Sequence, residues 1–343
     1  MTVGCNSEFD HALSLTPNFS WGLRRWIAIA IAGLATATAP MAHSRALEQA
    51  SKSSPSPRVS AQFEAEVSKL NVGGLKLKEA LEASLEAGGT HLAAIFQRDK
   101  PANPSEGFEF RIIENVAGIS KTIFRRTEFF FSFPAKGELA KLNATDINGD
   151  GVKEIIVQSS SGGNCWSCNP AEIYQVRNHK AQLIAAGPLQ RLADLNGDGI
   201  AELLVIDARW EVYGDLSHAA APSATMVYAW QGGRYVYASR DFAPFYRGEI
   251  ERLRAALAEA SAGITADEFS DEAYVGRAIA LALTFAHMGD PERGLKELET
   301  LMNSNVRSEA QAKKRAGVIE DFRKGESAKK LRELKYGDSM QVQ

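Results

Sequence analysis

Two nine-residue segments of this chain carry the side chains best suited to chemistry. Residues 146–154 have the sequence DINGDGVKE, residues 194–202 have DLNGDGIAE, and six of the nine positions are identical. In both segments, oxygen-bearing side chains stand at the first, third, fifth and ninth positions. Calcium takes about six to eight oxygen ligands, and a short segment can supply them when alternate residues point inward.

This spacing predicts two Ca²⁺ sites. The predicted side-chain ligands are Asp146, Asn148, Asp150 and Glu154 in the first segment and Asp194, Asn196, Asp198 and Glu202 in the second. The backbone carbonyls of Val152 and Ile200, together with water, are expected to complete the two sets. The alternative is a metal-free turn of the kind that Asn and Asp form by themselves. That alternative accounts for the Asn-Gly pairs but not for a carboxylate at the ninth position of both segments.

Both segments differ from EF-hand loops, which need a bidentate Glu at the twelfth position and a flanking helix on each side. Here the twelfth residues are Val157 and Val205, inside apolar runs of strand character. A D-x-[DN]-x-D-G-x-x-[DE] loop that leads directly into a strand resembles the FG-GAP/VCBS repeat family. The resemblance implies a calcium-stiffened β-propeller or partial propeller outside the cytoplasm, used for binding and adhesion more often than for catalysis. It covers residues 90–242, which hold about three units, whereas propellers of that family usually close with seven blades.

Residues 89–243 are expected to form a β domain of three similar antiparallel units. Short runs of β-branched and aromatic residues alternate there with Gly, Asn and Pro, which is typical of strands and turns. The predicted strands are 91–96, 108–114, 120–125, 154–158, 172–176, 182–186, 202–206, 225–230 and 235–238. The first unit has Gly88, Gly89 and Thr90 where the other two have the acidic segment. We expect blade-like sheets packed side by side, because one half-buried sheet is not stable alone.

Helical periodicity is found on both sides of this domain. In residues 61–88 the apolar residues recur at mostly helical spacing, with Gly73 and Gly74 between them, which predicts two short helices. Residues 244–343 are predicted to form a helical domain. The expected fold class is therefore α+β, with antiparallel blade-like repeats in a partial propeller, flanked by N-terminal helices and a C-terminal helical domain.

A helical hairpin is predicted within the C-terminal domain. Gly289 is suited to end one helix, and Asp290 and Pro291 are suited to begin the next. The hairpin resembles one tetratricopeptide repeat, with Gly294 where alanine is usual. Because a single repeat cannot form a binding superhelix, we expect it to pack against the sheets or the other helices.

The amino-terminal residues predict export. Arg24 and Arg25 precede an apolar run, 26–39, which is followed by small residues suited to signal-peptidase cleavage. A helix of that length rises only about 21 Å, less than the roughly 30 Å of a hydrocarbon layer, so cleavage is favoured over an uncleaved anchor. We assign residues 1–44 to a signal peptide and residues 45–60 to a Ser/Pro-rich linker. The expected location is periplasmic or secreted.

Cys165 and Cys168 would be the two cysteines of the exported chain, since Cys5 lies in the predicted signal peptide. Export and an even number favour a disulfide between them. Their C-x-x-C spacing also occurs in thiol oxidoreductases, where the first thiolate lies at a helix N-terminus. The flanking residues here predict a loop, and no His or Cys pair completes a zinc site.

Composition and motifs narrow the function. A net charge of −3 provides no basic excess for nucleic acid, and no membrane association is expected after cleavage. We find no nucleophile-elbow or phosphate-binding motif, and surface or packing roles are expected for the scattered residues His91, His179, His218 and His287. The favoured function is a non-catalytic binding or scaffolding module whose partner is a protein or a cell-surface polysaccharide, with oligomerisation possible. The rivals are a thiol oxidoreductase or hydrolase, and a helical adaptor supported by the β domain.

Overall fold

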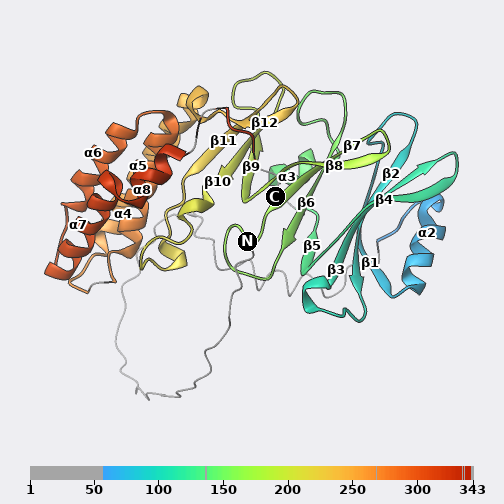
Figure 1. Ribbon diagram of the computed structural model, residues 1–343, viewed down its shortest axis with the longest axis horizontal. Helices are drawn as coiled ribbons and strands as arrows, with labels where there is room; N and C mark the ends of the chain where they lie inside the picture. The colour runs from blue at the N-terminus through green and yellow to red at the C-terminus, as the bar shows by residue number, and fades with distance from the viewer. Residues whose placement is uncertain (1–56, 136, 268, 334, 336, 341–343) are drawn as a thin grey trace, which may run out of the picture. The chain divides into compact units, whose positions relative to one another are not determined.

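The computed structural model describes residues 57–135, 137–267, 269–333, 335 and 337–340. The predicted signal peptide, and most of the predicted linker, therefore lie outside the described residues. Within them the chain forms three four-stranded antiparallel sheets and then a helical region (Figure 1). In each sheet the strands are hydrogen-bonded in their order along the chain, as in the blade of a propeller.

The strands and short helices of the β domain have the following bounds. The first sheet contains β1 (Leu75–Ala83), β2 (Thr90–Arg98), β3 (Phe108–Val116) and β4 (Ile119–Glu128). The second contains β5 (Phe130–Ser132), β6 (Glu154–Ser160), β7 (Ala171–Arg177) and β8 (Lys180–Gly187), with the helix α3 (Gly137–Leu142) between β5 and β6. The third contains β9 (Leu189–Ala193), β10 (Glu202–Ile206), β11 (Thr225–Gln231) and β12 (Arg234–Tyr237). Four 3-10 turns are η1 (Pro104–Glu106), η2 (Ala208–Trp210), η3 (His218–Ala220) and η4 (Ser239–Phe242).

The second sheet lies between the other two. Along β6, Ile155 and Val157 pack into a core shared with the first sheet, whereas Ile156 packs into a core shared with the third. Alternate side chains of a strand point to opposite faces, so β6 is buried on both sides. This explains why its sequence is a continuous apolar run without the alternation of a half-exposed strand.

Helices cover the outer faces of the first and third sheets. Phe63 and Val67 of α2 (Ala61–Val72) pack on Leu92 and Phe96 of β2, on the face opposite the second sheet. At the other end of the stack, the residues that form the corresponding core are Val227, Ala229, Ala238, Phe242 and Tyr246. The stack is thus closed by helices where a propeller would continue with further blades.

The helical region contains α4 (Ala243–Ala262), α5 (Glu272–Met288), α6 (Pro291–Met302), α7 (Glu309–Lys324) and α8 (Glu326–Glu333). Each helix contacts the next, and α5 also contacts η3, η4 and β11. The predicted hairpin is confirmed: Gly289 has φ +99° after α5, and the side chain of Asp290 accepts a hydrogen bond from Arg293 N at 3.3 Å. It packs against the other helices and the third sheet, as expected of a single repeat.

The prediction of two helices in 61–88 is wrong in its second half. Only Ala61–Val72 is helical, and Leu75–Ala83 is the strand β1, which pairs with β2. The pairing register shifts between Leu77 and Glu79, which marks a bulge. An extra residue reverses the face to which later side chains point, so Leu77 lies in one core and Leu81 in the other. With that reversal, Leu77 and Leu81 both pack against a core although they are four positions apart, and this spacing is also typical of a helix.

The three strands predicted for each unit are confirmed, within a few residues at their ends. Each sheet has one further strand that was not predicted, namely β1, β5 or β9, and each of these is the first strand of its sheet. The strands β5 and β9 are short, with three and five residues. β5 has too few residues for a pattern to be recognised, and in β9 a shift in pairing register interrupts the alternation of side chains.

The end of the described chain covers the edge of β12. Gly337 N donates to Tyr237 O at 2.9 Å, and Met340 N donates to Tyr235 O at 2.9 Å. Ser339 pairs with Val236 as an isolated antiparallel bridge. An uncovered edge strand could pair with another chain, and here residues 337–340 occupy that edge.

The predicted fold class is confirmed as α+β, with antiparallel four-stranded sheets, an N-terminal helix and C-terminal helices. Across the described residues the three sheets form no closed propeller ring. In the same part of the chain, no helix has both the length and the apolar character needed to cross a membrane.

Candidate metal centre

The first acidic loop, residues 146–154, connects α3 to β6. Its base is held by two backbone hydrogen bonds of 2.9 Å between Glu154 and residues 144 and 145. Within it, Asp146 accepts three backbone hydrogen bonds, from Gly149 N at 2.8 Å, Asp150 N at 3.2 Å and Gly151 N at 2.9 Å. The loop therefore wraps around the Asp146 carboxylate. Gly149 and Gly151 have φ of +70° and +84°, which is why glycine is favoured at both positions.

The second acidic loop, residues 194–202, connects β9 to β10 and repeats this pattern. Asp194 accepts from Gly197 N at 2.6 Å, from Asp198 N at 3.2 Å and from Gly199 N at 2.9 Å. At the fifth position, Asp150 accepts from Val152 N at 2.9 Å and Asp198 accepts from Ile200 N at 2.8 Å. Equal sequence spacing thus produces equal backbone geometry.

The glutamate at the ninth position is buried in both loops. Glu154 Oε2 accepts from Ile147 N at 2.9 Å, and Glu202 Oε2 accepts from Leu195 N at 2.8 Å. Both glutamates are about 1% exposed or less. Each is the first residue of its strand, so the strand places the carboxylate back under the loop.

Negative charge is concentrated in the first loop. Carboxylate oxygens of Asp146, Asp150 and Glu154 lie within 4.8 Å of one another. Burial, reinforced by the charges of Asp150 and Asp146, raises the pKa of Glu154 to about 7. Burial and the neighbouring aspartates likewise raise the pKa of Glu202. A bound cation would offset this repulsion, and a donor set made only of oxygens suits a hard cation such as calcium.

The third position differs between the loops. Asn148 Oδ1 accepts from Asp150 N at 3.1 Å, and its Nδ2 donates to Glu154 Oε1 at 3.2 Å. Asn196 Oδ1 accepts from Asp198 N at 3.0 Å, but its Nδ2 donates to Asp198 Oδ2 at 2.9 Å. Both amide oxygens therefore face into their loops. The loops themselves differ in exposure, since Asn148 is buried and Asn196 is exposed.

Two residues of β7 complete the first loop and were not predicted from the sequence. Gln175 Nε2 donates to Asp150 Oδ2 at 2.7 Å and to Glu154 Oε1 at 2.8 Å. Arg177 Nη2 lies 2.7 Å from Asp150 Oδ2. Gln175 is directly opposite Glu154 in the register of β6 and β7. The only available signal was a polar residue within a predicted strand, which by itself does not identify its partner.

The two acidic loops are in direct contact. Ala201 N of the second loop donates to Ile147 O of the first at 2.8 Å. A Cβ placed on Gly149 would lie 3.2 Å from the side chain of Ile200. The buried Tyr235 hydroxyl donates to Ala201 O at 3.4 Å, and burial, with Glu154 and Glu202 nearby, raises the pKa of Tyr235. All ten predicted ligand residues thus belong to two adjacent loops on neighbouring sheets.

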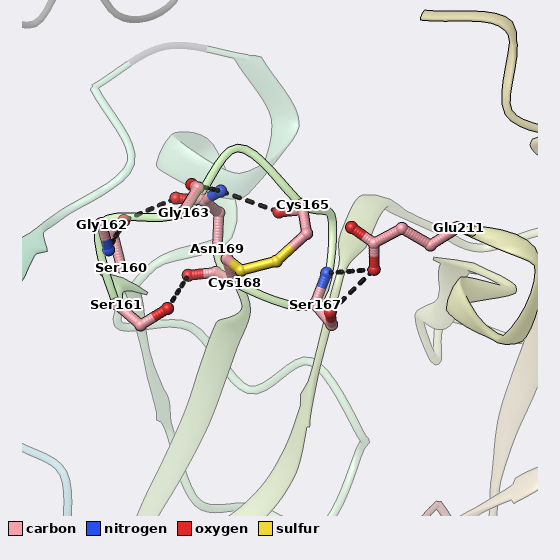
Figure 2. Close-up of a disulfide and its surroundings, with 9 residues drawn as sticks. All are labelled: Ser160, Ser161, Gly162, Gly163, Cys165, Ser167, Cys168, Asn169 and Glu211. Carbon is pink, nitrogen blue, oxygen red and sulfur yellow. Dashed lines mark hydrogen bonds between the residues drawn. A yellow bond between two sulfur atoms is a disulfide. The ribbon is translucent and has the colours of Figure 1, made fainter. Parts of the chain in front are cut away.

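Cys165 and Cys168 form a disulfide in the loop between β6 and β7, with their Cα atoms 5.0 Å apart (Figure 2). A turn connects them, in which Cys168 N donates to Cys165 O at 3.2 Å. The predicted loop is confirmed, so Cys165 does not lie at a helix N-terminus of the kind that activates a thiolate.

One carboxylate, that of Glu211 in the segment after β10, holds the disulfide loop. Figure 2 shows Ser167 facing Glu211, and both the N–H group and the hydroxyl of Ser167 donate to Glu211 Oε2, at 3.3 and 2.7 Å. Asn169 closes the loop from within, since its Nδ2 donates to Gly163 O and Cys165 O. These hydrogen bonds hold the loop in place.

Neither the protein-family models nor the curated proteins that were compared with this chain match it.

Proposed function

We propose that this is an exported calcium-binding β-repeat protein that acts as a non-catalytic binding or scaffolding module, in the periplasm or outside the cell. The observation that carries the proposal is the repetition of one loop geometry on two adjacent sheets, with Asp, Asn, Asp and Glu at equivalent positions. In both copies a buried carboxylate at the ninth position faces the aspartates of its loop, an arrangement that a bound cation would stabilise.

The chemistry of the loops supports calcium over other ions. Every predicted donor is an oxygen, and the carboxylates of Asp146, Asp150 and Glu154 already lie close together. Zinc favours nitrogen and sulfur donors, and magnesium keeps most of its waters. The likeness of the loops to the FG-GAP/VCBS pattern and the predicted signal peptide also favour calcium. Calcium-binding modules outside the cytoplasm function with a weak affinity for the ion.

The contact between the loops supports a structural role for the ions. Glu154 and Glu202 begin the second strands of neighbouring sheets, and Ala201 N bonds to Ile147 O across the gap. Binding at either loop would therefore also order the other. A stack stiffened in this way would present its outer loops to a protein or a polysaccharide, which is the partner class that we propose.

Calorimetric titration of chelator-treated protein with calcium tests the ion. We expect about two ions per chain, and a stabilisation of about 2.7 kcal/mol per site at a hundred times the dissociation constant. The paired Asp150→Asn and Asp198→Asn variant should lose both ions, because each Asn keeps the oxygen that accepts the loop N–H but removes a charge.

Asp215→Asn is the matched control, since Asp215 is exposed and belongs to neither loop. Melting temperatures measured without calcium separate loop folding from ion binding. If wild-type protein gives no heat and no calcium-dependent shift in melting temperature, the loops are bare turns and the proposal fails.

The binding role is tested separately. Immobilised wild-type protein should retain a periplasmic protein or a cell-surface polysaccharide in calcium and release it unchanged with chelator, whereas the paired variant should not retain it. Chemical turnover of the retained molecule would contradict a non-catalytic role.

A further inference from the structure

The first sheet has a loop at the position of the two acidic loops. Residues 84–89 connect β1 to β2, as the acidic loops lead into β6 and β10, and His91 is the second residue of β2. Leu85 N donates to His91 Nδ1 at 3.3 Å, in the place where Ile147 N and Leu195 N donate to Glu154 and Glu202. Gly88 has φ +86°, close to the +84° of Gly151 and the +85° of Gly199. His91 thus replaces the glutamate of the other two loops.

His91 is fully buried and one of its nitrogens lacks a hydrogen-bond partner. Its Nε2 lies 3.4 Å from Glu114 Oε1 without forming a hydrogen bond. Glu114 is directly opposite His91 in the register of β2 and β3, just as Gln175 is opposite Glu154. Because Nδ1 accepts the Leu85 N–H, a neutral His91 carries its proton on Nε2, directed at the Glu114 carboxylate.

A second histidine reaches the same carboxylate from the second sheet. His179 lies in the turn between β7 and β8, and its Nδ1 is 2.7 Å from Glu114 Oε1. Glu86 accepts from the backbone N–H groups of Asn178 and His179, at 2.6 and 3.0 Å. One ligand atom each from Glu86, Glu114 and His179 lie within 4.8 Å of one another.

The donor set differs in kind from that of the acidic loops. An imidazole nitrogen with two carboxylates suits zinc and related transition metals, whereas calcium takes oxygens. We propose that Glu86, Glu114 and His179 bind one divalent transition-metal ion of the zinc type, with water in the remaining position and His91 as a positioning residue for Glu114. The ion would join the first sheet to the second, because His179 belongs to a different sheet from the two glutamates.

Cobalt and zinc titrations of chelator-treated protein, purified without a histidine tag, test this site. We expect a visible Co²⁺ absorption spectrum of nitrogen and oxygen ligation and about one Zn²⁺ per chain by calorimetry. His179→Asn should abolish both signals, and Asn tolerates the φ of +59° at this position. His218→Asn, which removes another exposed histidine, should leave both unchanged.

The role of His91 has its own readout. His91→Ala should weaken Zn²⁺ binding about 10- to 100-fold and alter the Co²⁺ spectrum, and His91→Gln, which retains a donor and an acceptor, should restore part of the affinity. The melting temperature of each variant without metal reports whether it is folded. Equal zinc binding by wild type and His179→Asn, or no Co²⁺ spectrum in wild type, would overturn the proposal and leave the cluster as an ion-paired contact between sheets.

Discussion

At the residue scale, Gly163 illustrates how closely the disulfide loop is packed. A Cβ at this position would lie 2.4 Å from Cys168 Sγ and 3.1 Å from Cys168 Cβ. We predict that Gly163→Ala lowers the free energy of unfolding of the oxidised protein by about 1–3 kcal/mol, because the loop must shift to accept the methyl group. Urea denaturation measures this change.

A double-mutant comparison isolates the cause of that loss. In a Cys165→Ala and Cys168→Ala background the sulfur atoms are absent, so the same Gly163→Ala change should cost much less. Asn164→Ala, at an exposed position of the loop, is the control. An equal cost of Gly163→Ala in both backgrounds would show that the contact with sulfur is not responsible.

Asp207 is a buried carboxylate outside the acidic loops that accepts several hydrogen bonds. Arg209 donates to both of its oxygens, at 2.7 and 2.6 Å, and Trp210 Nε1 donates to Oδ2 at 3.0 Å. His287 of α5 lies 3.3 Å from Oδ2, and the Tyr237 hydroxyl is 2.9 Å from the other His287 nitrogen. Asp207 and its partners thus connect the end of β10 to the helical region.

The charge of Asp207 predicts a pH dependence of stability. Burial acts to raise its pKa, but the hydrogen bonds and charges of Arg209 and His287 outweigh burial and lower it. The pKa of an aspartate in the unfolded chain is about 3.9. Above that pH, the charged Asp207 contributes fully to the free energy of unfolding. This contribution is lost as the pH falls toward the lower pKa that Asp207 has in the folded protein. Asp207→Asn should therefore destabilise the protein at pH 7, by about 3–5 kcal/mol.

Denaturation midpoints at pH 7, 5 and 3, in buffers of equal ionic strength, check this prediction. The difference between wild type and Asp207→Asn should be smaller at pH 3 than at pH 5. The exposed control Asp215→Asn should show no comparable difference at any pH. A gap that widens at pH 3 would contradict the assignment of a charged Asp207.

At the element scale, the helical hairpin depends on a glycine inside α6. A Cβ on Gly294 would lie 2.5 Å from Ala282 O and 3.1 Å from Phe285 Cβ of α5. This close approach of the two helices explains the departure from the alanine that is usual in the tetratricopeptide pattern. Gly294→Ala should lower the free energy of unfolding by about 1–3 kcal/mol because of overpacking. This loss is expected although alanine is favoured over glycine in a helix by about 1 kcal/mol.

Gly317 in α7 is the matched control for that change. It is exposed, and no neighbouring element lies within 4 Å of the position that an added Cβ would take. Gly317→Ala should therefore raise the melting temperature, through helix propensity alone. If both substitutions raised it, the two helices of the hairpin would not be as close as the structure shows.

At the scale of the whole molecule, three sheets are sufficient because the ends of the stack are covered. Phe63 and Val67 of α2 protect the outer face of the first sheet, and Phe242 and Tyr246 protect that of the third. Residues 337–340 return from the last helix to pair with β12, and Met340 packs into the core between the second and third sheets. A closed ring of seven blades is therefore unnecessary for burial of these faces.

Removal of the C-terminal strand tests this account. A chain that ends at residue 336 should melt at a lower temperature and self-associate through the exposed edge of β12. Light scattering coupled to size-exclusion chromatography measures the association. A chain that ends at residue 340 keeps the paired residues and should behave as the full-length protein; identical behaviour of both truncations would show that the edge needs no cover.

Short-range patterns in the amino-acid sequence were sufficient to predict the local features of this protein. The repeated Asp, Asn, Gly and Glu spacing predicted two loops that enter strands, because hydrogen bonds such as those of Asp146 and Asp194 join residues three to five positions apart. The Gly289-Asp290-Pro291 signals predicted the hairpin for the same reason. Short β-branched and aromatic runs between turn residues were sufficient for three strands of every sheet, although not for β1, β5 and β9.

The contacts between distant residues depend on how the strands pair and the sheets pack. The bulge in β1 gave its side chains a false helical spacing, and the pairing with β2 resolved it. Gln175 reaches Glu154, and His179 reaches Glu114, through strand register and through the stacking of sheets. Those contacts join residues 21 and 65 positions apart, and no local spacing encodes them. The physical reason is that backbone turns are determined by neighbouring residues, whereas side-chain clusters depend on which faces the packed sheets bury.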